Sequence, residues 1–196
     1  FVWGLRLSSH ILMRNWGKAG DYRYQELRKS NPETFWWRSY FTIYLLQGVL
    51  IFFISLPFMA IFSDSTSAFG LLDYCATIVW GVGFYFEVVG DRELKQFKAN
   101  PANKGKLLRT GLWSLTRHPN YFGDACLWWG FYLLSCSTQY GMYTILSPVV
   151  MTLFLVKVSG VGLIEKKLAV TKPGYKEYME QVPAFIPKLT GYVKNQ

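Results

Sequence analysis

The sequence predicts an all-α, polytopic integral membrane protein, built as a helical bundle with at least four transmembrane helices. Two observations about composition predict this fold class. Hydrophobic residues make up 51% of the chain and the mean hydropathy is +0.14, although 21 residues are Lys or Arg. The charged residues are separated from apolar stretches that are long enough to cross a hydrocarbon layer of roughly 30 Å. A length of 196 residues suits a single domain, 1–196.

The distribution of basic residues is the third observation. All 21 Lys and Arg fall in segments 1–38, 90–120 and 157–196, and the two loops expected on the other side carry none. This asymmetry has the sign of the positive-inside rule and predicts a basic cytoplasmic, or equivalent, face. The membrane is then that of the endoplasmic reticulum, the mitochondrial inner membrane or the bacterial inner membrane.

The first third of the chain predicts one partial and one complete span. The chain starts without Met inside an apolar stretch, so we expect N-terminal helices to be missing and residues 1–13 to end a span. Residues 14–38 are polar and aromatic, which predicts an interfacial segment with a short amphipathic helix over 22–29. Residues 39–62 carry no charge and predict a transmembrane helix with a kink at Pro57.

The middle of the chain predicts a second span over 70–89 whose helix continues out of the membrane. Glu87, Asp91, Lys95 and Lys98 are spaced to lie along one face of that continuation. An ordinary solvated charged face has the same spacing. A basic loop rich in helix breakers follows over 99–106.

The motif at 111–124 places a cation, a histidine and two polar side chains where an apolar helix begins. Pro119 suits the first position of a helix, and the free N–H groups there, beside Arg117 and His118, favour a phosphate or a carboxylate. Asp124 lies one turn after Asn120, so we expect a polar cleft shared with the charged face of the second span. Interfacial anchoring and local pairing are the alternative roles for these side chains.

Two further spans and a folded tail complete the expected bundle. Residues 121–136 predict the third span and residues 142–156 the fourth. The tail, 166–196, alternates basic and aromatic residues and contains Pro183 and Pro187, so it should fold back over the membrane face. The three cysteines lie in apolar segments without metal-binding spacing, which predicts neither disulfides nor a metal site.

The net charge of +9 indicates that the protein binds anionic partners. Long apolar spans interrupt the basic residues, so nucleic acid is not an expected partner, whereas an anionic cofactor and membrane lipids are. No glycine-rich fingerprint follows a predicted strand, which excludes a Rossmann domain.

The motif at 111–124 closely resembles the signature of the membrane family that contains the C-terminal domain of steroid 5-alpha-reductases, especially its uncharacterised bacterial-type branch. The likeness covers practically the whole chain in order and extends through segments 17–24, 91–98, 159–167, 173–175 and 184–187.

The resemblance implies NADPH as cofactor, bound at the cytosolic ends of the helices, and reduction of a carbon–carbon double bond conjugated to a carbonyl in a steroid-like or isoprenoid lipid. The positions that match cofactor-binding residues, with their neighbours in the motif, are Asp91, Lys95, Lys98, Arg117, His118, Asn120, Tyr121 and Asp124. The two lysines stand where characterised reductases tend to have arginine, which keeps the charge but loses the bidentate geometry.

The catalytic residues are unknown, because in the characterised reductases they come from N-terminal helices that have no matching segment in this sequence. Two alternatives therefore stand beside the reductase. One is a methyltransferase that uses S-adenosylmethionine and resembles isoprenylcysteine carboxyl methyltransferases, which share an Arg-His-Pro motif and an acidic-basic segment like 165–167. The other is a non-catalytic, reductase-like subunit of a larger membrane complex.

Overall fold

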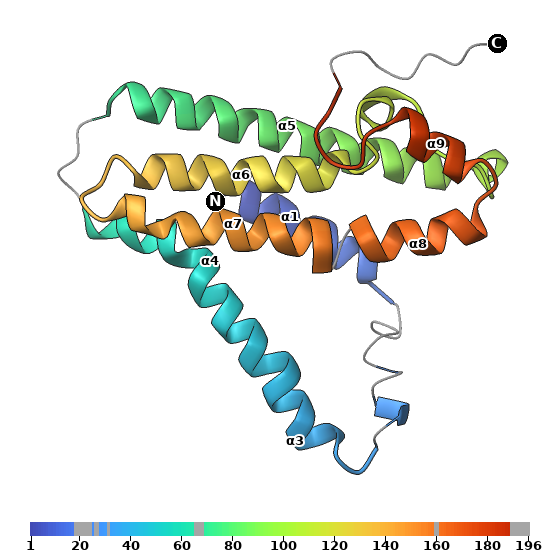
Figure 1. The fold of residues 1–196 in the computed structure, drawn as a ribbon, viewed down its shortest axis with the longest axis horizontal. Coiled ribbons are helices and arrows are strands. Elements are labelled where there is room, and N and C mark those ends of the chain that lie inside the picture. The colour runs from blue at the N-terminus through green and yellow to red at the C-terminus, as the bar shows by residue number, and fades with distance from the viewer. Residues whose placement is uncertain (18–24, 26–27, 31, 65–68, 159–160, 189–196) are drawn as a thin grey trace. The chain divides into compact units, whose positions relative to one another are not determined.

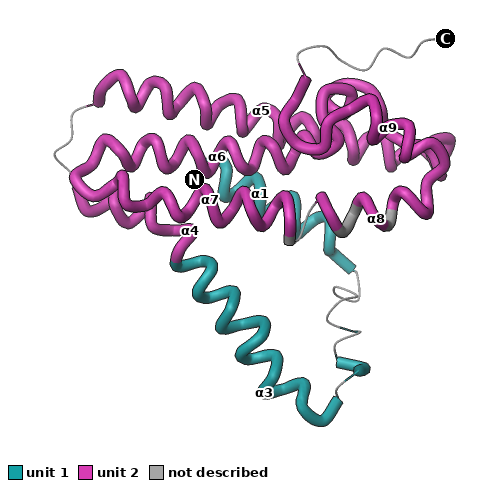
Figure 2. Tube along the Cα trace, viewed as in Figure 1, with its two compact units in different colours: residues 1–52 teal, residues 53–196 magenta. Residues whose placement is uncertain are grey.

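The computed structural model describes residues 1–17, 25, 28–30, 32–64, 69–158 and 161–188 (Figure 1). Within these ranges the chain is helical and contains no strand. It divides into two compact units, 1–52 and 53–196, and the boundary falls inside α4 (Figure 2). The all-α prediction is therefore confirmed for the described part of the chain.

The first unit consists of helices with exposed apolar side chains. It contains α1 (Val2–Asn15), α3 (Phe35–Ser39), the π-helical turn η1 (Tyr40–Leu45) and the first residues of α4 (Leu46–Ser63). The helix predicted at the start of the chain is confirmed, whereas the one predicted over 22–29 lies largely outside the described residues. Trp36 and Trp37 are exposed beside Arg38, as an interfacial aromatic belt requires.

Two helices are long and apolar enough to cross a membrane. They are Phe35–Ser63, which is continuous through α3, η1 and α4 and contains Pro57, and Leu71–Ala99, which is α5. Gly141–Lys157, made of η4 (Gly141–Ile145), α7 (Leu146–Leu153) and most of η5 (Phe154–Val158), is a shorter apolar helix. These lengths suggest association with a membrane, while the number of spans stays a prediction.

The second unit is organised around the antiparallel pair of α5 and α6 (Pro119–Ser135), with α7 beside α6 (Figure 1). Glycines allow the two backbones to touch: a Cβ atom on Gly123 would lie 2.5 Å from the Glu87 nitrogen, and one on Gly130 would lie 2.9 Å from the Cβ of Trp80. Small residues at such contacts are typical of helix pairs in membranes, where close packing drives association.

Hydrogen bonds fix the end of this helix pair away from the basic loop. Asp73 is buried and accepts from the Gly70 nitrogen and from the Ser137 hydroxyl, each at 2.8 Å. Its carboxylate therefore caps the start of α5 and joins it to the turn that follows α6.

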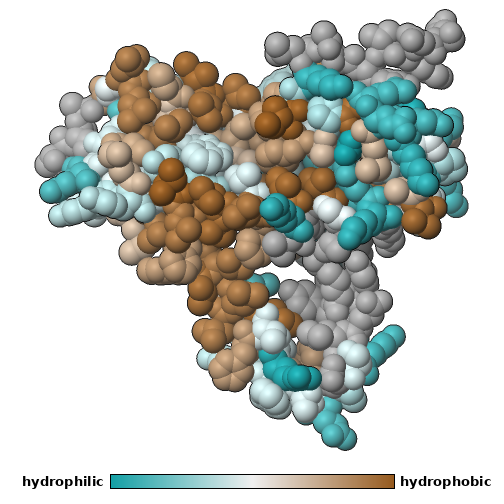
Figure 3. Space-filling model, viewed as in Figure 1, coloured by the Kyte–Doolittle hydropathy of each residue, from teal (hydrophilic) through white to brown (hydrophobic). Residues whose placement is uncertain are grey.

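The tail folds back onto the other end of the pair, and its place over a membrane face stays a prediction. Helix α8 (Val161–Thr171) leads into the tail, which continues with α9 (Tyr175–Gln181) and an extended segment that reaches Lys188. Tyr175, Tyr178 and Val182 form a buried cluster against Leu107, which directly follows the basic loop. Apolar side chains gather over α5 to α7 and polar ones around α8 and α9 (Figure 3).

Candidate functional site

The motif starts with a short 3-10 turn, η3 (Gly111–Ser114), which is fastened to α5. Glu93 accepts a hydrogen bond from the Leu112 nitrogen at 3.0 Å, and Trp113 Nε1 donates to the Gly90 carbonyl at 3.1 Å. Gly111 has φ +60°, and a Cβ atom there would lie 2.0 Å from a carboxylate oxygen of Glu93. The positive φ favours glycine, and any side chain here would push the Glu93 carboxylate away from the Leu112 nitrogen.

Helix α6 begins where the sequence predicts. His118 is the N-cap residue, with φ −137°, and Pro119 is the first helical residue. The Asn120 side-chain oxygen accepts from the Tyr121 nitrogen at 3.1 Å, which satisfies one of the free donors of the first turn. The His118 ring stacks on that of Tyr121, with centroids 5.3 Å apart and planes 12° apart.

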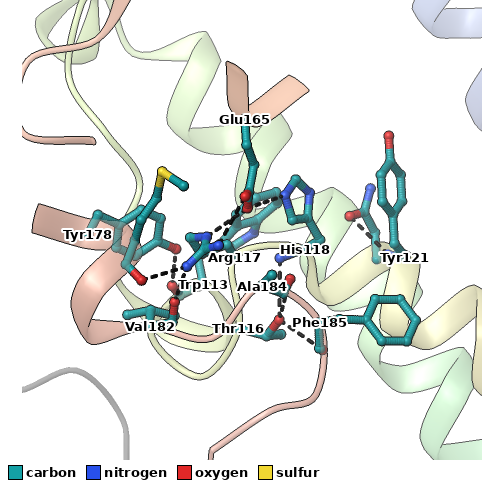
Figure 4. A network of polar contacts seen from close by, with 12 residues as sticks. Trp113, Thr116, Arg117, His118, Tyr121, Glu165, Tyr178, Val182, Ala184 and Phe185 are labelled. Atoms are coloured by element: carbon teal, nitrogen blue, oxygen red, sulfur yellow. Dashed lines mark hydrogen bonds and ion pairs between the residues drawn. The ribbon is translucent and has the colours of Figure 1, made fainter. Parts of the chain in front are cut away.

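Arg117 is buried and its side-chain donors are directed at groups of the chain itself (Figure 4). Its Nε and Nη2 atoms donate to the two carboxylate oxygens of Glu165 on α8, at 2.7 and 3.0 Å. Its Nη1 donates to the carbonyls of Met179, at 2.8 Å, and of Val182. The bidentate geometry is the strongest form of such a pair.

His118 completes this network from the other side of Glu165. Its Nε2 lies 3.1 Å from Glu165 Oε1, and both side chains are about nine-tenths buried. Burial alone would raise the pKa of Glu165, but hydrogen bonds from His118 and Arg117, with the charge of Arg117, outweigh burial and lower the pKa to about 2. An ionised carboxylate only accepts hydrogen bonds, so Nε2 of His118 carries a proton.

The tail is clamped to the residues just before α6. The Arg117 nitrogen donates to the Pro183 carbonyl and the Lys188 nitrogen to the Leu115 carbonyl, both at 2.9 Å. The hydroxyl of the fully buried Thr116 contacts the Ala184 and Phe185 carbonyls at 3.2 and 3.0 Å. We call this set of contacts, together with the Arg117–Glu165 pair, the tail clamp.

A second polar group joins α5 to α6. The Asn120 side-chain nitrogen donates to Asp91 Oδ1 at 3.1 Å, and both side chains are partly buried. Lys95 and Lys98 are exposed one and two turns further along α5, and Asp124 is partly buried one turn further along α6. We call Asp91, Asn120 and the two lysines the α5–α6 polar end.

The structure brings the predicted site residues into two groups. Asp91 lies beside Asn120, as expected from the predicted cleft. Arg117 does not share that contact, because its guanidinium is turned to Glu165 and the tail. The anion expected beside Arg117 and His118 is thus a carboxylate of the same chain.

Sequence reasoning missed Glu93 and Glu165 as the residues that position the motif. Glu165 has a recognisable signal, since it is an acid that directly follows the apolar run 161–164. The pairing of Glu165 with Arg117 has no sequence signal, because the two residues are 48 positions apart in the chain. Glu93 falls among the charges at the end of α5, where a solvated role is the ordinary expectation.

Comparison with known proteins gives relatives along the whole chain. An uncharacterized protein of Schizosaccharomyces pombe is 24% identical over 212 aligned residues, which cover 97% of this chain and 62% of the relative. A probable O-methyltransferase of Ustilaginoidea virens is 45% identical over 71 residues, which cover 35% of this chain and 25% of that protein. This chain therefore spans less than two thirds of either relative. No solved structure matches it significantly.

A family profile matches residues 1–182, which include the motif, Glu165 and α9. That family is related to steroid 5-alpha-reductase-like membrane proteins. The chain belongs to the family described as protein of unknown function DUF1295.

Proposed function

We propose that this protein is a membrane-embedded, NADPH-dependent reductase of a conjugated carbon–carbon double bond in a steroid-like or isoprenoid lipid. The observation that carries the proposal is the contact of Asp91 with Asn120, next to the exposed Lys95 and Lys98. It provides a carboxylate, an amide and two cations at one end of a helix pair, which is the donor and acceptor set that a dinucleotide requires.

The residues present fit the chemistry of this cofactor. Carboxylate and amide oxygens accept hydrogen bonds from ribose hydroxyls, and an amide N–H₂ donates to a carboxamide oxygen. The lysines provide point charges for phosphates. When bound, NADPH supplies a hydride, and the protein contributes binding and orientation. The tail clamp holds Asn120 and Tyr121 in place, because it fixes the residues immediately before α6.

A lipid substrate suits the surroundings of the α5–α6 polar end. Tyr74, Ile78, Val82 and Tyr85 are exposed along α5, so an apolar molecule in the bilayer can approach the helix pair from its side. An isolated hydrophobic side chain on a surface means little, whereas a continuous apolar helix face marks contact with lipid or another apolar partner.

The substitution Asn120→Ala tests the cofactor site. We expect it to weaken NADPH binding by up to about tenfold, since a hydrogen bond between uncharged groups contributes roughly 0.5–1.5 kcal/mol. Arg117→Ala is less suitable, because it would leave Glu165 buried without its main partner. The measurement is a titration of NADPH against detergent-purified protein by tryptophan fluorescence.

The matched control is Gln96→Ala, an exposed residue on the same helix α5, which should leave the affinity unchanged. Equal NADPH affinity in wild type and Asn120→Ala would contradict the assigned site. Absence of NADPH binding by the wild-type protein would contradict the reductase itself.

A second candidate function is methyl transfer to an oxygen atom of a lipid from S-adenosylmethionine. The observation that favours it is the similarity of a third of the chain to a probable O-methyltransferase. Calorimetric titration with S-adenosylmethionine distinguishes the two functions. Saturable binding of this ligand, with none of NADPH, would establish the second candidate in place of the first.

A further inference from the structure

Arg117 and His118 of the motif already contact groups of the same chain, so the phosphate groups of a ligand must be bound by other residues. The Arg117 side chain donates to Glu165 and to two backbone carbonyls, and His118 contacts the same carboxylate. Both residues are buried. A soluble anion would have to displace Glu165 to reach them, which would leave a buried carboxylate without its partners.

A cavity of about 570 Å³ lies at the basic end of α5, outside the tail clamp. Its volume falls within the range of small-molecule sites, roughly 300–1,000 Å³. The lining residues come from the last turn of α5, from the basic loop and the four residues after it, and from the turn before α9: Phe97, Gly105, Lys106, Leu107, Leu108, Arg109, Thr110 and Pro173.

The lining combines two cations with apolar walls. Lys106 is exposed, and Arg109 is partly buried with its guanidinium carbon 5.5 Å from the centre of the Tyr178 ring. One N–H₂ group of Arg109 donates to the Gly174 carbonyl, which holds the planar group in one orientation. The apolar walls are Phe97, Leu107, Leu108 and Pro173.

The segment 99–110, which carries these two cations, is held by its neighbours. Leu107 packs against the buried cluster of Tyr175, Tyr178 and Val182. The Asn103 side chain donates to the Phe97 carbonyl at 3.0 Å and ties the start of the loop to α5. The cavity is therefore bounded by anchored segments on both sides, and ligand binding need not order a free loop.

We propose that this cavity, the loop cavity, binds a phosphate ester that carries an apolar or planar group. Lys106 and Arg109 recognise the phosphate, and the walls around Phe97 take the attached group. Arginine and lysine are the usual partners of phosphate, and aromatic and aliphatic walls account for most of the contact area in small-molecule sites.

The loop cavity extends the proposed NADPH site, on which this part of the inference rests. Phe97 follows Asp91 by six residues, so their backbones are about 9 Å apart along α5. A dinucleotide is long enough to reach from the α5–α6 polar end to the cavity with its adenosine 2′-phosphate. The headgroup of an anionic lipid carries the same phosphate ester chemistry and would approach from the membrane surface.

The test compares Lys106→Gln with Lys104→Gln. Lys104 is exposed in the same loop but does not line the cavity, so both changes remove one charge from one segment. Two probes are titrated against detergent-purified protein: 2′,5′-ADP for the nucleotide, and dihexanoyl phosphatidylglycerol for the lipid, with dihexanoyl phosphatidylcholine as its neutral counterpart. We expect Lys106→Gln to weaken binding of one probe about tenfold, as loss of a charge-assisted hydrogen bond does.

Each outcome has a definite meaning. Loss of 2′,5′-ADP binding in Lys106→Gln alone supports a nucleotide ligand, and selective loss of phosphatidylglycerol binding supports a lipid ligand. Binding of neither probe to wild type, or equal losses in both variants, overturns the loop cavity as a site. If Asn120→Ala weakens NADPH binding and Lys106→Gln does not, the reductase site stands and only the cavity assignment fails. If phosphatidylglycerol binding depends on Lys106 and the wild-type protein does not bind NADPH, the loop cavity stands as a site and the reductase proposal fails.

Discussion

Glu165 is the residue on which the geometry of the motif depends most directly. Its carboxylate accepts hydrogen bonds from Arg117 and His118, which stand immediately before the first residue of α6. A buried ion pair adds little net stability compared with an apolar replacement, but removing one partner leaves an uncompensated charge. The pair therefore gives the motif one specific arrangement.

The substitution Glu165→Gln should destabilise the fold by roughly 3–5 kcal/mol, as loss of one member of a buried pair does. It should also change the dependence of stability on pH. The pKa of Glu165 is lowered from 4.5 to about 2 in the folded protein, so its contribution is complete above pH 4.5 and is lost as the pH falls towards 2. Unfolding in detergent, followed by tryptophan fluorescence at a series of pH values, measures both effects.

The control for this prediction is Glu180→Gln, the same chemical change at an exposed position of α9. It should leave the midpoint of unfolding and its pH profile nearly unchanged. The structural role assigned to Glu165 would be wrong if the two variants had the same stability and the same loss of stability between pH 4.5 and pH 2.

At the scale of elements, the close pairing of α5 with α6 determines where the polar residues meet. Backbone contact at Gly83 and Gly123 sets the register that brings Asp91 to Asn120. The glycines do not add apolar area. They allow the two backbones to approach at a position where any side chain would clash. The helices can therefore pack this closely only in the register that places these glycines opposite each other.

The substitution Gly123→Ala should therefore destabilise the helix pair by about 1–3 kcal/mol, the usual cost of overpacking. The new Cβ atom would lie 2.5 Å from the Glu87 nitrogen and 2.6 Å from the Gly83 carbonyl oxygen, and these backbone atoms cannot turn aside. Thermal unfolding in detergent measures the effect.

Gly81→Ala on α5 is the matched control, since a Cβ atom there has no neighbour within 4 Å. Its sign should be opposite, because alanine favours a helix over glycine by roughly 0.5–1 kcal/mol. A rise in stability in both variants would show that the two helices do not touch at Gly123.

The elements also show which features of this protein are readable from sequence. Pro119 gives the start of α6 and the long apolar runs give α4 and α5, because these signals act within one or two turns. Asp91 and Asn120 were expected to meet because a single loop joins their helices. The Arg117–Glu165 pair was not, since no local period relates segments from separate elements. The π-helical turns η1 and η5 have no sequence signal that we can name.

At the scale of the whole molecule, apolar helices and a basic end are separated along the chain. Leu71–Ala99 is apolar where it begins and charged where it ends, and the basic loop follows it. A helix of this length is about 44 Å long, more than the roughly 30 Å of hydrocarbon that it would cross. Its two ends should therefore lie on opposite sides of a membrane.

Labelling of single cysteines tests this expectation. Phe69→Cys and Lys104→Cys place exposed thiols before and after α5, in a background where Cys75, Cys126 and Cys136 are replaced by alanine. In sealed vesicles, a membrane-impermeant maleimide should label one variant directly and the other only after detergent is added. Direct labelling of both would show that α5 does not cross the bilayer.

The tail clamp has a consequence for the order in which this protein matures during its synthesis. Arg117 leaves the ribosome 48 residues before Glu165 and 65 residues before Val182, so its guanidinium has neither of these partners when α5 has already been synthesised. The motif therefore reaches its final form only after the tail up to Lys188 has been synthesised. A chain that stops short of Val182 would lack one of the carbonyls that hold the Arg117 guanidinium and would leave the tail clamp unfinished.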